Sequence, residues 1–218
     1  MLQIEQTADG SYTLFVPEMN EHYHSVKGAL TESEHIFINM GLKHSSVLSP
    51  RILEIGFGTG LNAFLTLIEA EKEQKKVHYT TIERYPITND LAGKLTYPDL
   101  ICPGKAKEFA ELHRADWNTD IIITPYFTIN KIKADFTCYP FKKGYDIIYF
   151  DAFAPEKQPE MWSQELFDKL YGCLNEKGIL TTYCAKGCVR RMLQHSGFLV
   201  ERLPGPPGGK REILRATK

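Results

Sequence analysis

The sequence predicts an α/β fold in which a mostly parallel sheet of seven strands carries helices on both faces and ends in a β-hairpin. Short apolar runs of strand type alternate with helical patterns from residue 51 onward, and the 218 residues suffice for a domain with its own core. Because strands joined through helices run parallel with right-handed crossovers, this alternation predicts a doubly wound sheet. We divide the chain into an N-terminal extension, residues 1–45, packed on a main domain, residues 46–218.

The N-terminal extension contains two expected elements. Residues 11–16 (SYTLFV) have the composition of a short strand. The pattern Thr31-x-x-Glu34 is a capping box, in which two side chains satisfy free N–H groups at a helix start. It predicts a helix that begins near Thr31 and ends at Gly41.

The first half of the main domain opens with the apolar run RILEI at 51–55, which is typical of a buried strand. From Leu61 apolar residues recur at helical spacing up to the charged EKEQKK. VHYTTIE at 77–83 forms the second strand and ends at an acid. Prolines interrupt residues 86–126, where we expect only a helix at about 104–114.

The second half supplies three more strands, at 127–135, 145–151 and 178–184. Residues 198–203 and 211–217 are expected to pair as a terminal hairpin across the turn PGPPGG. Two helical patterns lie on either side of the fifth strand, at about 159–172 and 187–196.

Composition excludes several classes of protein. Hydrophobic residues make up 43% and charged residues 24% of the chain, as in ordinary globular proteins. No run reaches the ~18–20 apolar residues of a membrane span, and no secretory signal opens the chain, so we expect a cytoplasmic protein. The five cysteines are odd in number and none forms a Cys-x-x-Cys pair, so we expect neither a metal site nor a disulfide framework.

The stretch ILEIGFGTGLN at 52–62 places Gly56, Gly58 and Gly60 directly after a buried strand. Glycine tolerates positive φ and lets a ligand approach the backbone, and such sheets bind ligands at the carboxyl ends of their strands. The spacing differs from the dinucleotide fingerprint G-x-G-x-x-G, because Leu61 stands at its third glycine position, and no P-loop pattern is present. The order Glu54-x-Gly-x-Gly-x-Gly matches the cofactor loop of class I S-adenosylmethionine-dependent methyltransferases, which have a Rossmann-like fold.

Acidic residues stand at the same end of four expected strands: Glu54, Glu83, Asp135 and Asp151. One acid at a strand end means little, because chains reach the surface there, but four favour a ligand site. Glu83 is suited to accept hydrogen bonds from both ribose hydroxyls, and Asp135 from the adenine amino group. We assign to the same cofactor site the neighbouring residues Phe57, Asn62, Arg84 and Phe136.

The segment YFDAFAPEKQPEMW at 149–162 places Asp151 after the fourth strand, the position from which a methyltransferase contacts its substrate. Two prolines stiffen the following loop, and Phe153 and Trp162 are expected to stack on an aromatic substrate. The alternative is a proline-braced loop in which Asp151 only caps a helix.

The C-terminal part of the chain is basic, although the formal net charge is only -1. From residue 186 onward the sequence contains only two acidic residues but eight Lys and Arg residues: Lys186, Arg190, Arg191, Arg202, Lys210, Arg211, Arg215 and Lys218. Such a block fits an anionic partner, and the alternative is a solvated face without a partner.

Taken together, these stretches resemble a known family, the methyltransferase module of the tRNA wobble-uridine modification enzyme MnmC and its stand-alone counterpart MnmD. The segment DAFAPEKQPEMW is the most specific, whereas GFGTGLN is shared with many other methyltransferases. The resemblance runs over nearly the whole chain and rests on residues 20–38, 56–62, 82–86, 151–162, 181–198 and 208–214.

The resemblance implies a reaction and a partner. The family uses S-adenosyl-L-methionine to methylate the primary amine of 5-aminomethyl-(2-thio)uridine at tRNA position 34, which gives the 5-methylaminomethyl product. It implies Asp151 as the catalytic residue, contact with the anticodon region, and a functional link to the enzymes that make the aminomethyl group. FAD is not expected, because this chain has no room for the flavin-dependent oxidase domain of the bifunctional enzyme. The residues expected to bind the substrate are Tyr23, Ser25, Phe153, Trp162, Lys186, Arg190, Lys210 and Arg211.

One departure from the family concerns the residue after Asp151, where the usual glycine is Ala152. The added methyl group affects fine geometry but not the class of reaction. An alkyl ammonium has a pKa of about 10.4 and an unperturbed aspartate one of about 3.9, so aspartate is a poor base for it. We therefore expect Asp151 mainly to grip and aim the amine, while the proton leaves to water or through this carboxylate.

Two other functions remain open from the sequence. The first is a class I methyltransferase that acts on a small amine or a protein. The second is a non-catalytic Rossmann-like nucleotide-binding or scaffold protein, although a scaffold has no need of the four acids and the glycine loop. The glycine spacing disfavours a dehydrogenase.

Overall fold

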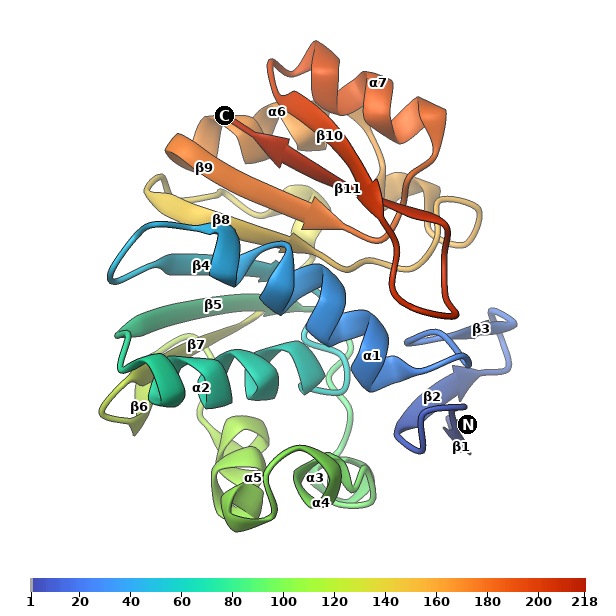
Figure 1. The fold of residues 1–218 in the computed structure, drawn as a ribbon, viewed down its shortest axis with the longest axis vertical. Coiled ribbons are helices and arrows are strands. Elements are labelled where there is room, and N and C mark those ends of the chain that lie inside the picture. The colour runs from blue at the N-terminus through green and yellow to red at the C-terminus, as the bar shows by residue number, and fades with distance from the viewer. Residues whose placement is uncertain (1) are drawn as a thin grey trace.

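The computed structural model describes residues 2–218 and contains an eight-stranded sheet of order β10-β11-β9-β8-β4-β5-β7-β6 (Figure 1). The strands β9, β8, β4, β5 and β7 run parallel, whereas β6 and β11 are antiparallel to their neighbours. The strand bounds are β4 (Arg51–Ile55), β5 (Val77–Glu83), β6 (Asp120–Thr124), β7 (Phe127–Lys133), β8 (Tyr145–Phe150), β9 (Leu174–Thr182), β10 (Leu199–Pro204) and β11 (Glu212–Thr217).

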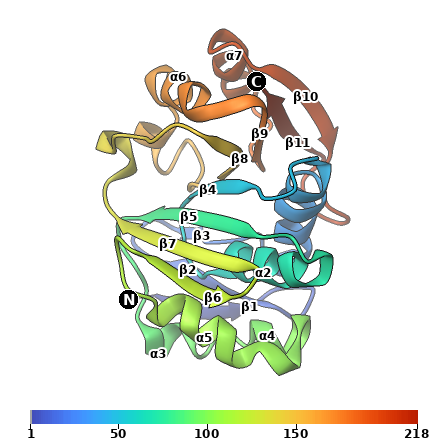
Figure 2. The same cartoon turned by 90° about the vertical axis from the view of Figure 1, so that its left-hand side faces the viewer.

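Helices cover both faces of this sheet, as the sequence predicts (Figures 1 and 2). On one face lie α2 (Leu61–Glu73), α3 (Asn89–Ala92), α4 (Tyr97–Ile101), the short turn η3 (Pro103–Lys105) and α5 (Ala106–Arg114). On the other face lie the turns η4 (Phe136–Cys138) and η5 (Pro159–Met161), α6 (Gln164–Cys173) and α7 (Gly187–His195).

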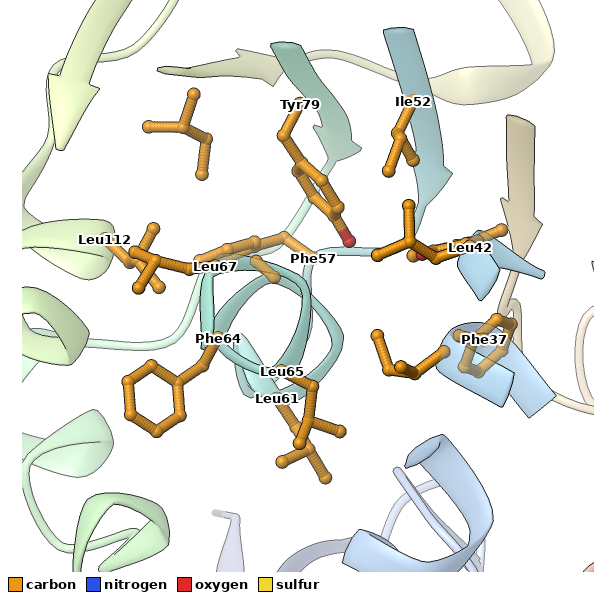
Figure 3. Packing of buried hydrophobic residues seen from close by; sticks show 14 of the residues in the cluster. Phe37, Leu42, Ile52, Phe57, Leu61, Phe64, Leu65, Leu67, Tyr79 and Leu112 are labelled. Carbon is orange, nitrogen blue, oxygen red and sulfur yellow. The ribbon is translucent and has the colours of Figure 1, made fainter. Parts of the chain in front are cut away.

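The core consists of two clusters of buried residues, one on each face. Successive side chains of a strand point to opposite faces, so Ile52 joins one cluster and Leu53 the other. Figure 3 shows part of the first cluster, in which Tyr79 points from the sheet toward α2. Phe64 of α2 packs edge-on against Phe109 of α5, with ring centroids 5.2 Å apart.

The N-terminal residues form a small unit beside the carboxyl ends of the parallel strands. It contains a three-stranded sheet, β1 (Gln3–Gln6), β2 (Tyr12–Val16) and β3 (Glu21–His22), followed by α1 (Ala29–Ser33), the π-helical turn η1 (Glu34–Asn39) and the 3-10 turn η2 (Leu42–His44). Leu14, Ile36 and Phe37 belong to the same core cluster as α2. The division at residue 45 stays a prediction.

Two sequence predictions need correction. The sheet has eight strands rather than seven, because residues 120–124, within the proline-interrupted region, pair with β7 as an antiparallel edge strand. The first helix starts at Ala29 rather than at the expected capping box, and the Thr31 hydroxyl donates a hydrogen bond to Asp9 Oδ2 at 2.8 Å. Within residues 2–218 no helix is both long and apolar enough to cross a membrane.

Candidate active site

A cavity of about 820 Å³ opens at the carboxyl ends of the parallel strands. After β4 the chain builds the sheet outward through β5 and β7, then returns to add β8 and β9 on the other side of β4. Connections leave β4 and β8 in opposite directions at this switch point, which leaves a crevice between them. The glycine loop follows β4 and Asp151 follows β8, so both line the cavity.

The glycine loop is shaped by the protein itself as well as by any ligand. Gly58 has φ 51°, and a Cβ added to it would lie 3.0 Å from the ring of Tyr23. Gly60 has φ 75°, and its Cβ would lie 2.7 Å from His113 Nε2. Side chains are therefore excluded at both positions by backbone conformation and by neighbouring rings, a cause that the sequence pattern does not reveal.

The two carboxylates predicted to hold ribose and adenine both reach the cavity. Glu83 accepts hydrogen bonds from the backbone N–H of Gly58 at 3.0 Å and of Tyr85 at 2.7 Å, so it fixes the loop that it faces. Asp135 accepts from Thr137 and pairs with Arg84 Nη1 at 2.6 Å. These hydrogen bonds lower the pKa of Asp135, chiefly those from Thr137, so it is a carboxylate at neutral pH.

Asp151 lies partly exposed in the cavity directly beside the glycine loop. A Cβ on Gly56 would lie 3.1 Å from the Asp151 carbonyl oxygen. Asn62 Nδ2 donates to Asp151 Oδ2 at 2.8 Å, so Asn62 holds this carboxyl group. Desolvation by the surrounding protein raises the pKa of Asp151 to about 7, and the Asn62 hydrogen bond opposes that rise.

The alternative role for Asp151 does not fit the structure. Ser163, and not Asp151, caps α6, since its hydroxyl oxygen accepts from Leu166 N at 3.3 Å. The loop after Asp151 is held from behind: Trp162 Nε1 donates to Phe153 O at 2.8 Å, and Tyr183 Oη donates to Ala152 O at 2.8 Å.

Glu54 is fully buried in β4 beneath the loop and does not line the cavity. Burial raises its pKa to about 8, while the polar groups of Thr81, Tyr79 and Asn62 act in the opposite direction. Most of the Glu54 carboxyl groups are therefore protonated at neutral pH.

Of the three aromatic residues predicted to bind the substrate, two line the cavity and one is buried in the core. Tyr23 and Phe153 both line the cavity, with ring centroids 5.0 Å apart in an edge-on arrangement. Trp162 does not line it: its side chain is 6% exposed and packs against Phe150, Phe167 and Tyr183. Trp162 therefore braces the loop from within the core, and nothing is left of its ring for a substrate to stack on.

Of the four basic residues predicted to bind the substrate, one lines the cavity and three lie outside its lining. Lys210 lines the cavity, pairs with Glu32 Oε1 at 2.6 Å and lies 4.2 Å from the ring centroid of Tyr183. Lys186 pairs with Glu156 outside the cavity lining. Arg190 and Arg211 do not line the cavity either, and Arg211 is exposed.

The structure places other predicted residues as follows. The cavity lining includes Gly56, Phe57, Gly58, Asn62, Glu83, Arg84, Asp135, Phe136, Asp151, Tyr23, Ser25, Phe153 and Lys210, whereas Gly60 lies just outside it. Sequence reasoning missed Glu32 and Tyr183, which come from α1 and from the end of β9. Both are isolated polar residues without a recognisable motif; only the position of Tyr183 after a strand would have indicated it.

The cavity has features that fit S-adenosyl-L-methionine. Its wall provides the carboxylates of Glu83 and Asp135 and the positive-φ glycines Gly56 and Gly58, where a ligand can approach the backbone. Its volume of about 820 Å³ also leaves room for a second molecule beside a cofactor of this size. Within residues 2–218 no group of three or more His, Cys, Asp or Glu side chains could hold a metal ion.

Comparisons with known proteins show the family to which this chain belongs. Residues 107–218 match the model of a family described as S-adenosyl-L-methionine-dependent methyltransferase. The bifunctional tRNA 5-methylaminomethyl-2-thiouridine biosynthesis protein MnmC of Cupriavidus metallidurans is 30% identical over 222 residues, which cover 94% of this chain and 32% of that protein. MnmC of Leptospira borgpetersenii is 29% identical over 88% of this chain and 31% of its own length.

Solved structures give the same result. The crystal structure of MNMC2 from Aquifex aeolicus superposes with a TM-score of 0.80 at 27% identity, covering 99% of this chain and 70% of that one. Spermidine synthase from Thermotoga maritima shares the fold, with a TM-score of 0.61 at 15% identity over 100% of this chain and 69% of the other.

The sheet, the glycine loop and the acids at the strand ends together define a Rossmann-like methyltransferase. This chain belongs to the S-adenosyl-L-methionine-dependent methyltransferase family, which confirms the predicted cofactor and enzyme class. The resemblance to the methyltransferase part of MnmC is also confirmed. The chain spans about a third of the length of the curated relatives that it matches.

Proposed function

We propose that this chain methylates the primary amine of 5-aminomethyl-(2-thio)uridine at the wobble position of tRNA, in the cytoplasm. The observation that carries the proposal is the position of Asp151, which is held by Asn62 beside the glycine loop and lines the same cavity as Tyr23 and Phe153. The names of the matching relatives support the choice of nucleoside.

The cofactor supplies an electrophilic methyl group on a sulfonium, and the amine must present a free lone pair to it. An alkyl ammonium with a pKa of about 10.4 has to lose a proton first. Asp151, with its pKa raised to about 7, is a far better acceptor for that proton than an unperturbed aspartate. We therefore revise the sequence-based expectation: Asp151 acts as a general base and not only as an anchor for the amine.

The remaining groups position the substrate. Tyr23 and Phe153 form an apolar corner next to Asp151, against which a uracil ring can pack. Asn62 holds one oxygen of the Asp151 carboxyl group through a hydrogen bond and leaves the other free to accept a proton. Residues of the N-terminal segment, Tyr23 and Ser25 among them, cover the cavity.

RNA binding is assigned to the basic residues of the β10–β11 loop and of the start of α7. Exposed Arg211 and the neighbouring Lys210 lie in the loop between β10 and β11, which reaches toward the N-terminal unit (Figure 1). Lys186 and Arg190 lie at the start of α7. We assign them contacts to phosphates of the anticodon region, and the substrate must come from enzymes that build the aminomethyl group.

The test uses tRNA from cells that lack this protein, incubated with the purified chain and methyl-labelled S-adenosylmethionine. Digestion to nucleosides and mass analysis should identify a labelled 5-methylaminomethyl uridine. If RNA takes up no label while the cofactor still binds, the tRNA assignment is wrong and the acceptor is a small amine or a protein.

A further inference from the structure

A second cavity, of about 290 Å³, lies behind the glycine loop. Phe57 belongs to the walls of both cavities, so this residue lies between the second cavity and the cofactor cavity. Lys131 of β7 is fully buried at this place, although its charge has no part in the methyl transfer described above. Burying an ammonium group is costly, so its partners indicate what it does.

The partners of Lys131 come from α5 and from the glycine loop. Its Nζ donates to the His113 carbonyl oxygen at 2.5 Å. His113 lies in the last turn of α5, where carbonyl groups have no donor within the helix, so Lys131 closes that end of the helix. The ammonium also lies 4.7 Å from the ring centroid of Trp117 and 5.6 Å from that of Phe57, distances typical of cation–π contacts.

The side chain of His113 connects α5 to the glycine loop. Its Nε2 lies 3.1 Å from the Thr59 carbonyl oxygen. A carbonyl only accepts, so Nε2 carries the proton and donates it to Thr59. The ring centroid of His113 also lies 5.1 Å from that of Phe57, and its Nε2 occupies the space that a side chain at Gly60 would need.

We propose that Lys131 is a positioning residue for the cofactor, because its ammonium group holds Phe57 and His113, and these two hold the glycine loop in the conformation that binds S-adenosylmethionine. The inference concerns cofactor affinity alone. It holds whichever acceptor receives the methyl group, and its tests need no acceptor.

Charges around Lys131 make the support dependent on pH. Burial lowers the pKa of Lys131 to about 8, and the nearby Asp116 opposes that shift. Arg114 lines the same cavity. Burial, followed by the charge of Lys131, lowers the pKa of His113 to about 4, so His113 stays neutral throughout the range in which Lys131 titrates. The contacts of the charged Lys131 ammonium that hold the glycine loop are therefore present below about pH 8 and lost above it.

The first test is calorimetric titration of the full chain with S-adenosylmethionine. Lys131→Met removes the charge while keeping most of the volume, and it should weaken cofactor binding about tenfold at pH 7. Amides of residues 56–60 should exchange hydrogen faster in this variant. Lys107→Met on the exposed face of α5, where the side chain is 85% exposed, should leave both properties unchanged.

The second test compares the wild type with Lys131→Arg, which stays charged at all pH values. Between about pH 7 and pH 9 the wild type should lose about fivefold more cofactor affinity than this variant. Glu54 titrates in the same range in both proteins, so the difference between them isolates Lys131. This comparison decides the matter if Lys131→Met does not fold.

Equal pH dependence in the wild type and Lys131→Arg would overturn the proposal. So would a folded Lys131→Met protein with wild-type affinity and unchanged exchange at residues 56–60. A Lys131→Met protein that binds the cofactor normally but melts at a lower temperature would show that Lys131 serves only the stability of the fold.

Discussion

At the scale of single residues, the proposed chemistry depends on one carboxyl group, that of Asp151, whose pKa is changed by its surroundings. Asp151 would be a weak base in water, but desolvation raises its pKa to about 7. Asn62 restrains that rise and orients the group through a hydrogen bond of 2.8 Å. The pair therefore balances basicity against the fraction of Asp151 that is ionised at neutral pH.

Replacing Asp151 by Asn should separate catalysis from cofactor binding. We expect turnover to fall at least about 100-fold, because the proton acceptor is lost, while S-adenosylmethionine affinity stays within about twofold. Single-turnover rates and calorimetry measure the two properties. A variant that keeps near-normal kcat would contradict the assignment of Asp151 as the proton acceptor.

The same substitution makes a prediction about stability. The pKa of Asp151 is raised to about 7 from its ordinary value of 3.8, so the folded state holds its proton more tightly than the unfolded state. Stability from this group is present at low pH and is lost as pH rises to about 7. Asp151→Asn should therefore melt at a higher temperature than the wild type at pH 8, and a lower melting temperature would argue against this burial effect.

The pH profile of activity tests the Asn62 contact. kcat/KM should rise with pH through about 7, as Asp151 loses its proton. Because the Asn62 hydrogen bond lowers the pKa of Asp151, Asn62→Ala should move the midpoint to higher pH. An unmoved midpoint in this variant would mean that another group controls the profile.

At the scale of elements, the site depends on contacts between segments far apart in the chain. Glu32 of α1 and Lys210 of the β10–β11 loop form an ion pair of 2.6 Å at the cavity, and Lys157 Nζ donates to Met19 O at 2.8 Å. The Glu32 side chain is only 9% exposed, so solvent screens this pair less than a surface pair.

Breaking this pair should loosen the N-terminal segment. Lys210→Met leaves the Glu32 carboxylate buried without its partner, so hydrogen exchange in residues 20–32 should become faster and substrate KM should rise about tenfold. Arg202→Met on the same hairpin, whose partner Glu212 is 3.8 Å away, is the matched control and should change neither property. Identical behaviour of the two variants would mean that the pair does not hold the segment.

Local patterns predicted most elements of the sheet, because alternation and turn residues report on local conformation. They placed Gly56, Glu83, Asp135 and Asp151 at one edge of the sheet, where all four line the cavity. They did not reveal why Gly60 lacks a side chain, since His113 fills that space from 53 residues further along the chain. The edge strand β6 was missed because prolines surround it, and the core position of Trp162 depends on packing with α6 that no local pattern encodes.

At the scale of the whole molecule, the cavity lies between the sheet edge, the N-terminal unit and the terminal hairpin, three regions that a large acceptor would contact together (Figure 1). Basic residues differ in how much charge they offer to RNA. Lys186 already pairs with Glu156, whereas Arg211 is exposed with no ion pair among the described residues.

This difference predicts unequal effects on tRNA binding. Arg211→Ala should weaken binding and reduce the slope of log affinity against log salt by about 0.7–0.9, the contribution of one phosphate contact. Lys186→Ala should have the smaller effect, since Glu156 offsets its charge. Filter binding across a salt series measures both, and an unchanged slope for Arg211→Ala would place the RNA on another face.

The most direct test of the central claim uses a synthetic anticodon stem-loop that carries a single 5-aminomethyl uridine at the wobble position. Incubated with the full chain and S-adenosylmethionine, it should gain the mass of one methyl group on that nucleoside, at a rate that Asp151→Asn abolishes. An unmodified stem-loop in the presence of bound cofactor would contradict the claim that the crevice between β4 and β8 methylates this amine.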